Sequence, residues 1–446
     1  MISILFYIII ISVLVLLLYN YKSGIILSLM VITNFGEFIY VNPNLEIGDF
    51  GGIGTIYFTD LFFTSLLIVF FLKASRFKEF NYKLSFLIFI LLCIIALIIP
   101  FLISSFSLKD MISVARPFIN ILFLPYFVVT ITDMKEFNFF EKVVVSMIFF
   151  FIVVQVFEYI TQKRIPFRLF ESESLFFGED PFSVEFEGIK TGYIWSRIGY
   201  LLPFNLFFGC YYYFSEKRNY GLLLLTAYLL SIMIALSRIW IIGFAFFLII
   251  ISVFFLSKQD SREHVRLKLF AFIGSFILIG VILLFTSSTF NQIFDIFLLR
   301  VNSINDLADK TDSSFLGREY ILFQMFNVWA EYPLFGAGFS AITRRLITND
   351  LGFPNILTIF GASGIFLFSL FFYQYYKNIR PFIQEYYILF VSLASVMMML
   401  IFMSIFSIDM FYFNASGAIL MAIANILYNI SKQKDSIEIT GYKNAA

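Results

Sequence analysis

Long apolar segments separated by short hydrophilic stretches fill most of this chain. A helix needs about 20 apolar residues to cross the hydrocarbon core of a bilayer, where it satisfies its own backbone hydrogen bonds. The pattern therefore predicts an all-α fold, a polytopic transmembrane bundle of about 12 to 13 spans. The segments fall at residues 2–19, 24–40, 57–72, 84–104, 111–132, 142–160, 197–214, 220–236, 239–256, 269–287, 352–376, 386–406 and 411–430.

Basic residues next to short loops set the orientation of these spans, because such clusters mark the cytoplasmic side of a membrane. Both ends of the stretch Tyr220–Leu256 are flanked by basic residues, so this stretch predicts a tight hairpin of two helices. Its single charge, Arg238, would then lie at the hairpin tip on the outer face. The same register places the amino terminus outside. The clusters are Lys73, Arg76, Lys78 and Lys83; Lys217 and Arg218; Lys258, Arg262, Arg266 and Lys268; and Lys432 and Lys434.

This register also divides the chain into regions. In the large outer loop, residues 290–300 and 317–330 carry apolar residues at helical spacing, which predicts amphipathic helices lying in the interface as a lid. The predicted regions are N-terminal transmembrane helices at 1–160, a first, mostly acidic outer loop at 161–196, central transmembrane helices with the Ser-Arg hairpin at 197–287, the large outer loop at 288–350, C-terminal transmembrane helices at 351–430 and a cytoplasmic tail at 431–446.

Composition narrows the classes of function. Hydrophobic residues make up 60% of the chain and charged residues 14%, values far from those of soluble domains. A net charge of +1 gives no concentrated basic face for nucleic acid. The single histidine, His264, lies in a loop predicted to be cytoplasmic, so no histidine can act as a base or metal ligand on the outer side. We expect neither a metal nor a cofactor.

Arginines collect on the predicted outer side, where acidic residues are otherwise in the majority. Guanidinium groups match phosphate oxygens in a bidentate fork and keep their charge near lipid, so these residues suit a lipid-linked phosphate or diphosphate. The alternative for each is contact with lipid headgroups. Phosphate binding is the favoured interpretation for two of them at helix ends, Arg197 and Arg238, and headgroup contact for Arg344 and Arg345. Arg318 completes the set.

Three pieces of the chain resemble the O-antigen polymerase and O-antigen ligase superfamily of bacterial envelope glycan enzymes. The order of the pieces and the large outer loop also match, so the resemblance covers most of residues 190–370. The pieces are Ser196-Arg197-Ile-Gly199 followed by Pro203 and Asn205; Leu236-Ser237-Arg238 at the opening of a helix; and Gly317-Arg318 through Trp329 and Pro333-Leu334-Phe335-Gly336-Ala337-Gly338 to Gly361-Ala-Ser-Gly364.

The resemblance implies a fold related to the lipid-dependent glycosyltransferases, GT-C-like, in the bacterial cytoplasmic membrane. It implies a metal-independent reaction on the outer face, in which an acceptor hydroxyl attacks the anomeric carbon of a glycan on undecaprenyl diphosphate. Arg197 and Arg238 would bind the diphosphate and stabilise the charge that develops on the leaving group. Arg318 would order the outer loop or contact glycan or diphosphate. The implied partners are the lipid-linked oligosaccharide and the bilayer, with a chain-length regulator as a further candidate.

One departure from the family bears on the reaction. Related ligases carry a histidine late in the large outer loop, as the proposed base toward the acceptor, whereas this chain has Thr348-Asn349-Asp350 there. We therefore favour a polymerase of O-antigen, capsule or exopolysaccharide over a ligase. Asp350 is the candidate general base, and an N-cap role for the following helix is the alternative. A flippase or other transporter is the rival from another class, but no internal repeat supports it.

Overall fold

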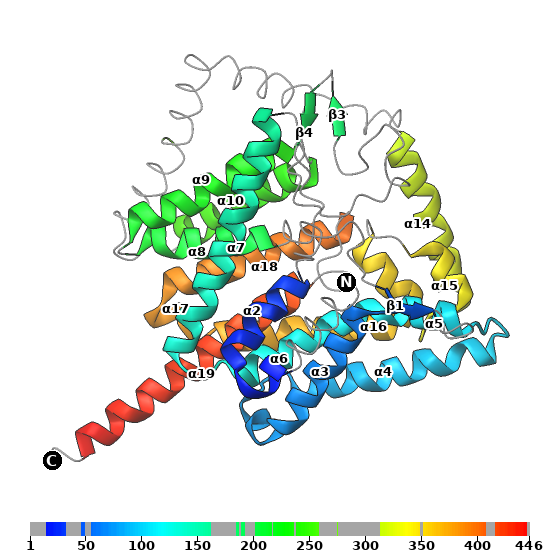
Figure 1. Cartoon of the computed structure of the whole chain (residues 1–446), viewed down its shortest axis with the longest axis horizontal. Coiled ribbons are helices and arrows are strands. Elements are labelled where there is room, and N and C mark those ends of the chain that lie inside the picture. The colour runs from blue at the N-terminus through cyan, green and yellow to red at the C-terminus, as the bar shows by residue number, and fades with distance from the viewer. Residues whose placement is uncertain are drawn as a thin grey trace, which may run out of the picture.

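Helices dominate the computed structural model (Figure 1). Two short antiparallel hairpins, β1 (Glu46–Asp49) with β2 (Thr55–Tyr57) and β3 (Val184–Phe186) with β4 (Ile189–Thr191), are the strands of the described part of the chain. The predicted all-α class is confirmed. The structure describes residues 15–32, 46–49, 55–161, 184–186, 189–191, 201–215, 217–235, 238–257, 274, 313–347, 351–406 and 415–443.

Six helical segments of the described residues are long and apolar enough to span a membrane. The chain is thus a multi-pass membrane protein, as predicted, while the predicted total of about 12 to 13 spans stays a prediction. The six are α4 (Lys83–Leu102), the run Leu108–Thr130, α7 (Met134–Thr161), α10 (Arg238–Ser257), α16 (Gly352–Ile379) and α18 (Tyr387–Phe406).

Further helices complete the bundle. The run Leu108–Thr130 is built from α5 (Leu108–Ala115), the 3-10 helix η4 (Arg116–Leu122) and α6 (Phe123–Thr130). Apart from Gly274, the predicted span 269–287 lies outside the described residues, and so does the whole of the predicted helix 290–300. The remaining helices are α2 (Tyr21–Ile32), α3 (Phe58–Leu72), η3 (Ala74–Glu79), α8 (Leu202–Phe214), α9 (Arg218–Ala235), α14 (Ser313–Glu331), α15 (Ala341–Leu346), α17 (Phe382–Glu385) and α19 (Ser416–Lys443).

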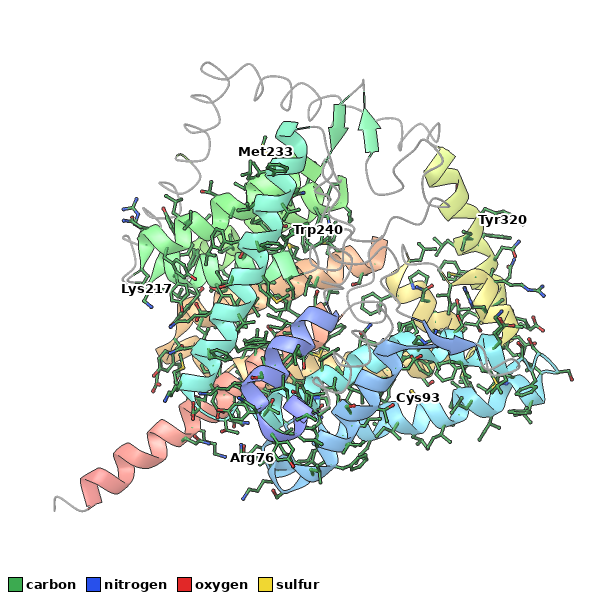
Figure 2. All side chains as sticks on the ribbon, viewed as in Figure 1. Arg76, Cys93, Lys217, Met233, Trp240 and Tyr320 are labelled. Atoms are coloured by element: carbon green, nitrogen blue, oxygen red, sulfur yellow. The ribbon has the colours of Figure 1, made fainter. Side chains whose placement is uncertain are left out.

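Hydrogen bonds join the predicted cytoplasmic loop at 73–83 to helices α16 and α19. The Asn81 backbone N–H donates to Asn425 Oδ1 at 2.8 Å, and Asn81 Nδ2 donates to Asn378 Oδ1 at 2.7 Å. On neighbouring helices, the Tyr387 hydroxyl donates to the Phe254 carbonyl, which joins the start of α18 to the end of α10. Figure 2 shows Lys217 at the left and Arg76 at the lower left, with Tyr320 of α14 at the right. The described parts of the predicted cytoplasmic loops therefore lie at one end of the bundle, here called the basic end, while the predicted loop at 258–268 lies outside the described residues.

The central helices pair differently from the prediction. The chain does break into two helices next to Arg238, but α9 packs mainly along α8, and α10 packs mainly along α18. Glycine explains the choice of partner, because small residues let helix backbones approach closely in a membrane. A Cβ at Gly209 would lie 2.8 Å from Leu225 Cγ, and one at Gly221 would overlap the Tyr213 backbone. The predicted tight pairing of the two helices around Arg238 was wrong.

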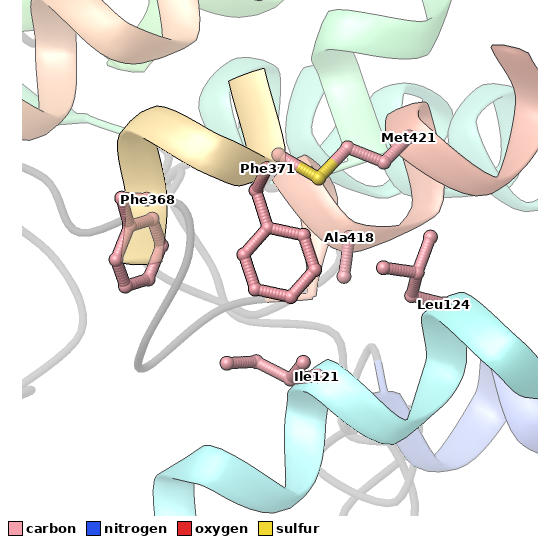
Figure 3. A pocket seen from close by; sticks show the side chains of 6 residues that line it. All are labelled: Ile121, Leu124, Phe368, Phe371, Ala418 and Met421. Atoms are coloured by element: carbon pink, nitrogen blue, oxygen red, sulfur yellow. The ribbon is translucent and has the colours of Figure 1, made fainter. Parts of the chain in front are cut away.

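A small cavity lies in the core between α6, η4, α16 and α19 (Figure 3). Its lining side chains are all apolar, so it offers a charged or polar ligand no partner. We regard it as a packing gap and not as a binding site. The lining residues are Ile121, Leu124, Phe368, Phe371, Ala418 and Met421.

Candidate functional site

Helix α16 is broken at Gly361, and the loop that follows α14 fills the break. Gly361 has φ +59° and ψ −148°, a conformation close to one that glycine alone readily adopts. The break frees backbone groups on both sides of it. Ala337 N–H donates to the Thr358 carbonyl at 2.8 Å, and in return Ala362 N–H donates to the Pro333 carbonyl at 2.8 Å. The kink is therefore held by reciprocal backbone bonds.

The same loop also donates a hydrogen bond to a free carbonyl of a second interrupted helix, α4. Pro100 has no N–H, so the Ala96 carbonyl, four residues earlier, loses its usual donor. Phe339 N–H donates to that carbonyl at 2.9 Å. We call the segment Pro333–Ala341 the clasp, because it joins α4 to α16.

Two glycines of the clasp are required by its geometry. Gly336 and Gly338 have φ of +64° and +63°, in the left-handed region that favours glycine. A Cβ at Gly336 would lie 2.6 Å from the Ile359 carbonyl oxygen, and one at Gly338 would lie 2.6 Å from the Ala96 oxygen. The pattern Pro-Leu-Phe-Gly-Ala-Gly is thus explained by close backbone approach to both helices.

The clasp leads directly into α15, which carries two of the predicted binding residues. Ser340 is buried and caps α15, because its Oγ accepts from Thr343 N–H at 3.2 Å. Arg344 and Arg345 occupy the last turn, where the helix dipole favours cations, and both are exposed. Since α15 packs on α5, the arginine pair lies at the end of the bundle opposite the basic end (Figure 1).

The other predicted site residues fall on separate elements. Arg318 lies in the second turn of α14, and this helix packs on α15 and α16. The helix predicted for 317–330 is confirmed. Arg238 is the first residue of α10. Because Phe254, near the other end of α10, lies at the basic end, Arg238 lies roughly 24 Å from it, toward the end that holds the clasp.

Two predicted residues, Arg197 and Asp350, lie outside the described residues. Leu351 is the N-cap residue of α16, so Asp350 comes one residue before the cap position. The predicted roles of both residues stay predictions. Arg318 and the Arg344-Arg345 pair lie on two helices, α14 and α15, that contact each other, while Arg238 is carried by a helix that packs on α18.

An ion pair near the clasp was missed at the level of sequence. Arg116 Nε donates to Asp60 Oδ1 at 2.8 Å and Arg116 Nη2 donates to Asp60 Oδ2 at 3.0 Å. The two side chains are 25% and 24% exposed. Two residues further along η4, Phe118 packs on Phe339 of the clasp with ring centroids 5.7 Å apart. The available signal was the charge of Arg116 inside the apolar segment 111–132. Ionisable residues within membrane-spanning segments are rare and usually pair with a group of opposite charge.

The central and clasp regions are the part of the chain that matches a known family. Residues 221–358 match the family model Wzy_C, described as O-antigen ligase. The chain carries an O-antigen ligase family domain. This domain is shared by polymerases and ligases, and it implies an enzyme that transfers glycan in the synthesis of surface polysaccharide. A comparison with curated proteins finds no match.

The O-antigen ligase family domain includes most of the elements described above. It begins in α9, contains α10, α14, the clasp and α15, and ends within the first part of α16, just before the Gly361 kink. Four predicted arginines lie within it, namely Arg238, Arg318, Arg344 and Arg345, and so does Asp350. The predicted resemblance is confirmed for this region, while Arg197 and Arg116 lie before it.

Proposed function

We propose that this O-antigen ligase family protein is a polymerase that joins lipid-linked oligosaccharide repeats on the outer face of the bacterial cytoplasmic membrane. The acceptor hydroxyl of one repeat attacks the anomeric carbon of a glycan held on undecaprenyl diphosphate. The new glycosidic bond forms as the bond from that carbon to the diphosphate oxygen breaks, and the hydroxyl proton passes to a base. The observation that carries the proposal is the family domain, with its arginines spread over α10, α14 and α15.

Arginines suit the leaving group of this reaction. Negative charge grows on the diphosphate oxygen in the transition state, and preorganised cations stabilise it without the need for a metal. We assign this role to Arg238 and Arg197, and contact with glycan or diphosphate to Arg318, Arg344 and Arg345. Preorganisation is supported by the clasp, since its backbone bonds to α4 and α16 fix the start of α15.

The proton acceptor is assigned to Asp350. A carboxylate can accept the hydroxyl proton as the new bond forms. The single histidine of the chain, His264, lies in the loop predicted on the cytoplasmic side, which favours polymerase over ligase. We expect Asp350→Asn to lower turnover with little change in folding, and unchanged turnover would assign the base elsewhere.

The proposal is tested by chain extension on purified lipid-linked repeats. The wild-type protein should give a ladder of products, and Arg238→Ala should reduce the rate about 100-fold to 1,000-fold, as loss of one preorganised donor does elsewhere. Arg197→Ala should act in the same direction. Arg380→Ala is the matched control, because Arg380 is exposed and follows α16 at the basic end. A ladder from Arg238→Ala like that of the wild type would rule out the assigned role.

A ligase is the second candidate, because the family description names that activity. The two reactions differ in their acceptor. A polymerase extends repeats when the lipid-linked repeat is the only substrate, whereas a ligase gives product only when a different acceptor glycolipid, such as a lipid A core, is added. Product that depends on the second acceptor would replace the polymerase assignment.

A further inference from the structure

Asn205 in α8 is a buried amide without a partner in the described protein. Its side chain is 0% exposed, and neither Nδ2 nor Oδ1 makes a hydrogen bond. Tyr228 in α9 is also 0% exposed, and its hydroxyl is unpaired as well. By contrast, Gln155 and Ser231 in the same bundle are paired reciprocally, at 2.7 and 3.2 Å. Buried polar groups nearly always find a partner, so such exceptions require an explanation. Among the described residues, Tyr126, Asn378 and Ser395 also carry an unpaired atom, but in Asn205 both polar atoms of the side chain are unpaired.

The register of α8 and α9 places these two residues opposite each other. The helices are antiparallel, with Gly209 facing Leu224 and Leu225. Asn205 lies one turn before Gly209 on the same face of α8, because residues four apart share a face. Because the two helices are antiparallel, one turn back along α8 corresponds to one turn forward along α9, from Leu224 and Leu225 to Tyr228. Asn205 and Tyr228 therefore occupy the same level of the α8–α9 interface.

Tyr228 also connects this level to the start of α10. Its ring packs against Phe244 and Trp240, with centroids 5.5 and 6.4 Å away. Trp240, labelled in Figure 2, is 1% exposed and follows Arg238 by two residues. A shift of Tyr228 would consequently be transmitted to the first turn of α10, where Arg238 lies.

We infer that Asn205 and Tyr228 together bind an ordered water molecule between α8 and α9, and that this bridge positions the first turn of α10. An amide buried without a partner in an apolar medium is strongly unfavourable. A water with two to four polar partners removes that penalty. Asn205 is thus a positioning residue that acts through Tyr228 and Trp240, and its effect on glycan transfer rests on the function proposed for Arg238.

A stability cycle tests the bridge without reference to the reaction. The variants are Asn205→Leu, Tyr228→Phe and the double variant, and the measurement is the Tm of the purified protein in lipid nanodiscs. If a water joins the two side chains, each single change lowers Tm, and the double change lowers it little more than the larger single change. If nothing joins them, both apolar replacements raise Tm and their effects add. That second result would overturn the inference.

Activity then tests the positioning role. Asn205→Leu should lower kcat of chain extension about tenfold with KM within about twofold, because a small misplacement acts on the chemical step. Asn205→Asp keeps a polar group at the site and should restore most of the rate. Ser231→Ala is the matched control: it removes a satisfied polar group at the α7–α9 contact and should lower Tm while kcat is kept. Equal kcat for Asn205→Leu and wild type would overturn the positioning role.

The two proposals fail in different ways. If neither wild type nor any variant extends lipid-linked repeats, the proposed polymerase function fails, while a non-additive Tm cycle still supports the bridge. If chain extension needs Arg238 but is indifferent to Asn205→Leu, the polymerase function stands and the bridge does not position its site.

Discussion

The clasp and the Asn205–Tyr228 pair deal with polar groups inside the bundle in opposite ways. At the clasp, helix bonds lost at Pro100 and Gly361 are replaced by backbone partners from Pro333–Ala341. At Asn205 and Tyr228, no protein partner is provided. An interrupted helix is tolerated within a membrane only where other parts of the protein make hydrogen bonds to its free backbone groups, and the clasp does this for α4 and α16. A buried side chain that the protein leaves unsatisfied points instead to a bound molecule.

The largest effect should come from Gly361→Ala. The replacement puts a Cβ 2.6 Å from the Pro333 carbonyl oxygen and forces a backbone conformation that alanine avoids. We expect a loss of about 3 kcal/mol or more, measured as unfolding of the purified protein or as failure to accumulate in the membrane. Gly274→Ala is the control, since a Cβ there meets no neighbour within 4 Å. If both variants were equally stable, the clasp would not be the scaffold described here.

Removal of the Arg116–Asp60 ion pair should have the next largest effect. Arg116→Ala and Asp60→Ala should each lower the unfolding free energy by about 1 to 2 kcal/mol, because the pair is bidentate and only partly exposed. The double variant should lose little more than either single variant. Additive losses in denaturant titration would mean that the two side chains act separately.

Loss of the cap of α15 should be smaller. Ser340→Ala removes the acceptor for Thr343 N–H and should lower stability by about 1 kcal/mol. Ser107→Ala, at the N-cap of α5, is the comparison: its Oγ accepts at a longer distance, 3.4 Å, and is less buried. The Tm of Ser340→Ala should therefore be lower than the Tm of Ser107→Ala. The reverse order would mean that the Ser340 cap contributes little to holding α15 in place.

Arg344→Ala and Arg345→Ala should change stability least, within about 0.5 kcal/mol, because both side chains are exposed. If they hold glycan or diphosphate, KM for the lipid-linked repeat should rise several-fold at low salt, and the difference should shrink as salt is added. Unchanged KM at low salt would leave them as headgroup contacts.

Local signals in the sequence predicted much of the fold. Within the described residues, the long apolar runs are helical, the described basic loops lie at one end, and a helix does begin at Arg238. Pairing of helices was beyond local signals, because the glycines that join α8 to α9 act across the interface. For the site, the Gly-rich motif was visible but its purpose was not, since the Ala96 carbonyl that it satisfies lies more than 200 residues earlier.

The clasp also has a consequence for exchange of parts between related enzymes. The carbonyl that Phe339 satisfies belongs to α4, whereas the family domain starts at residue 221. A chimera that imports only residues 221–358 would bring a clasp shaped for one proline kink into a bundle that lacks it. Helix α4 and the clasp must therefore be inherited, or transplanted, as a unit, although more than 200 residues separate them in the sequence.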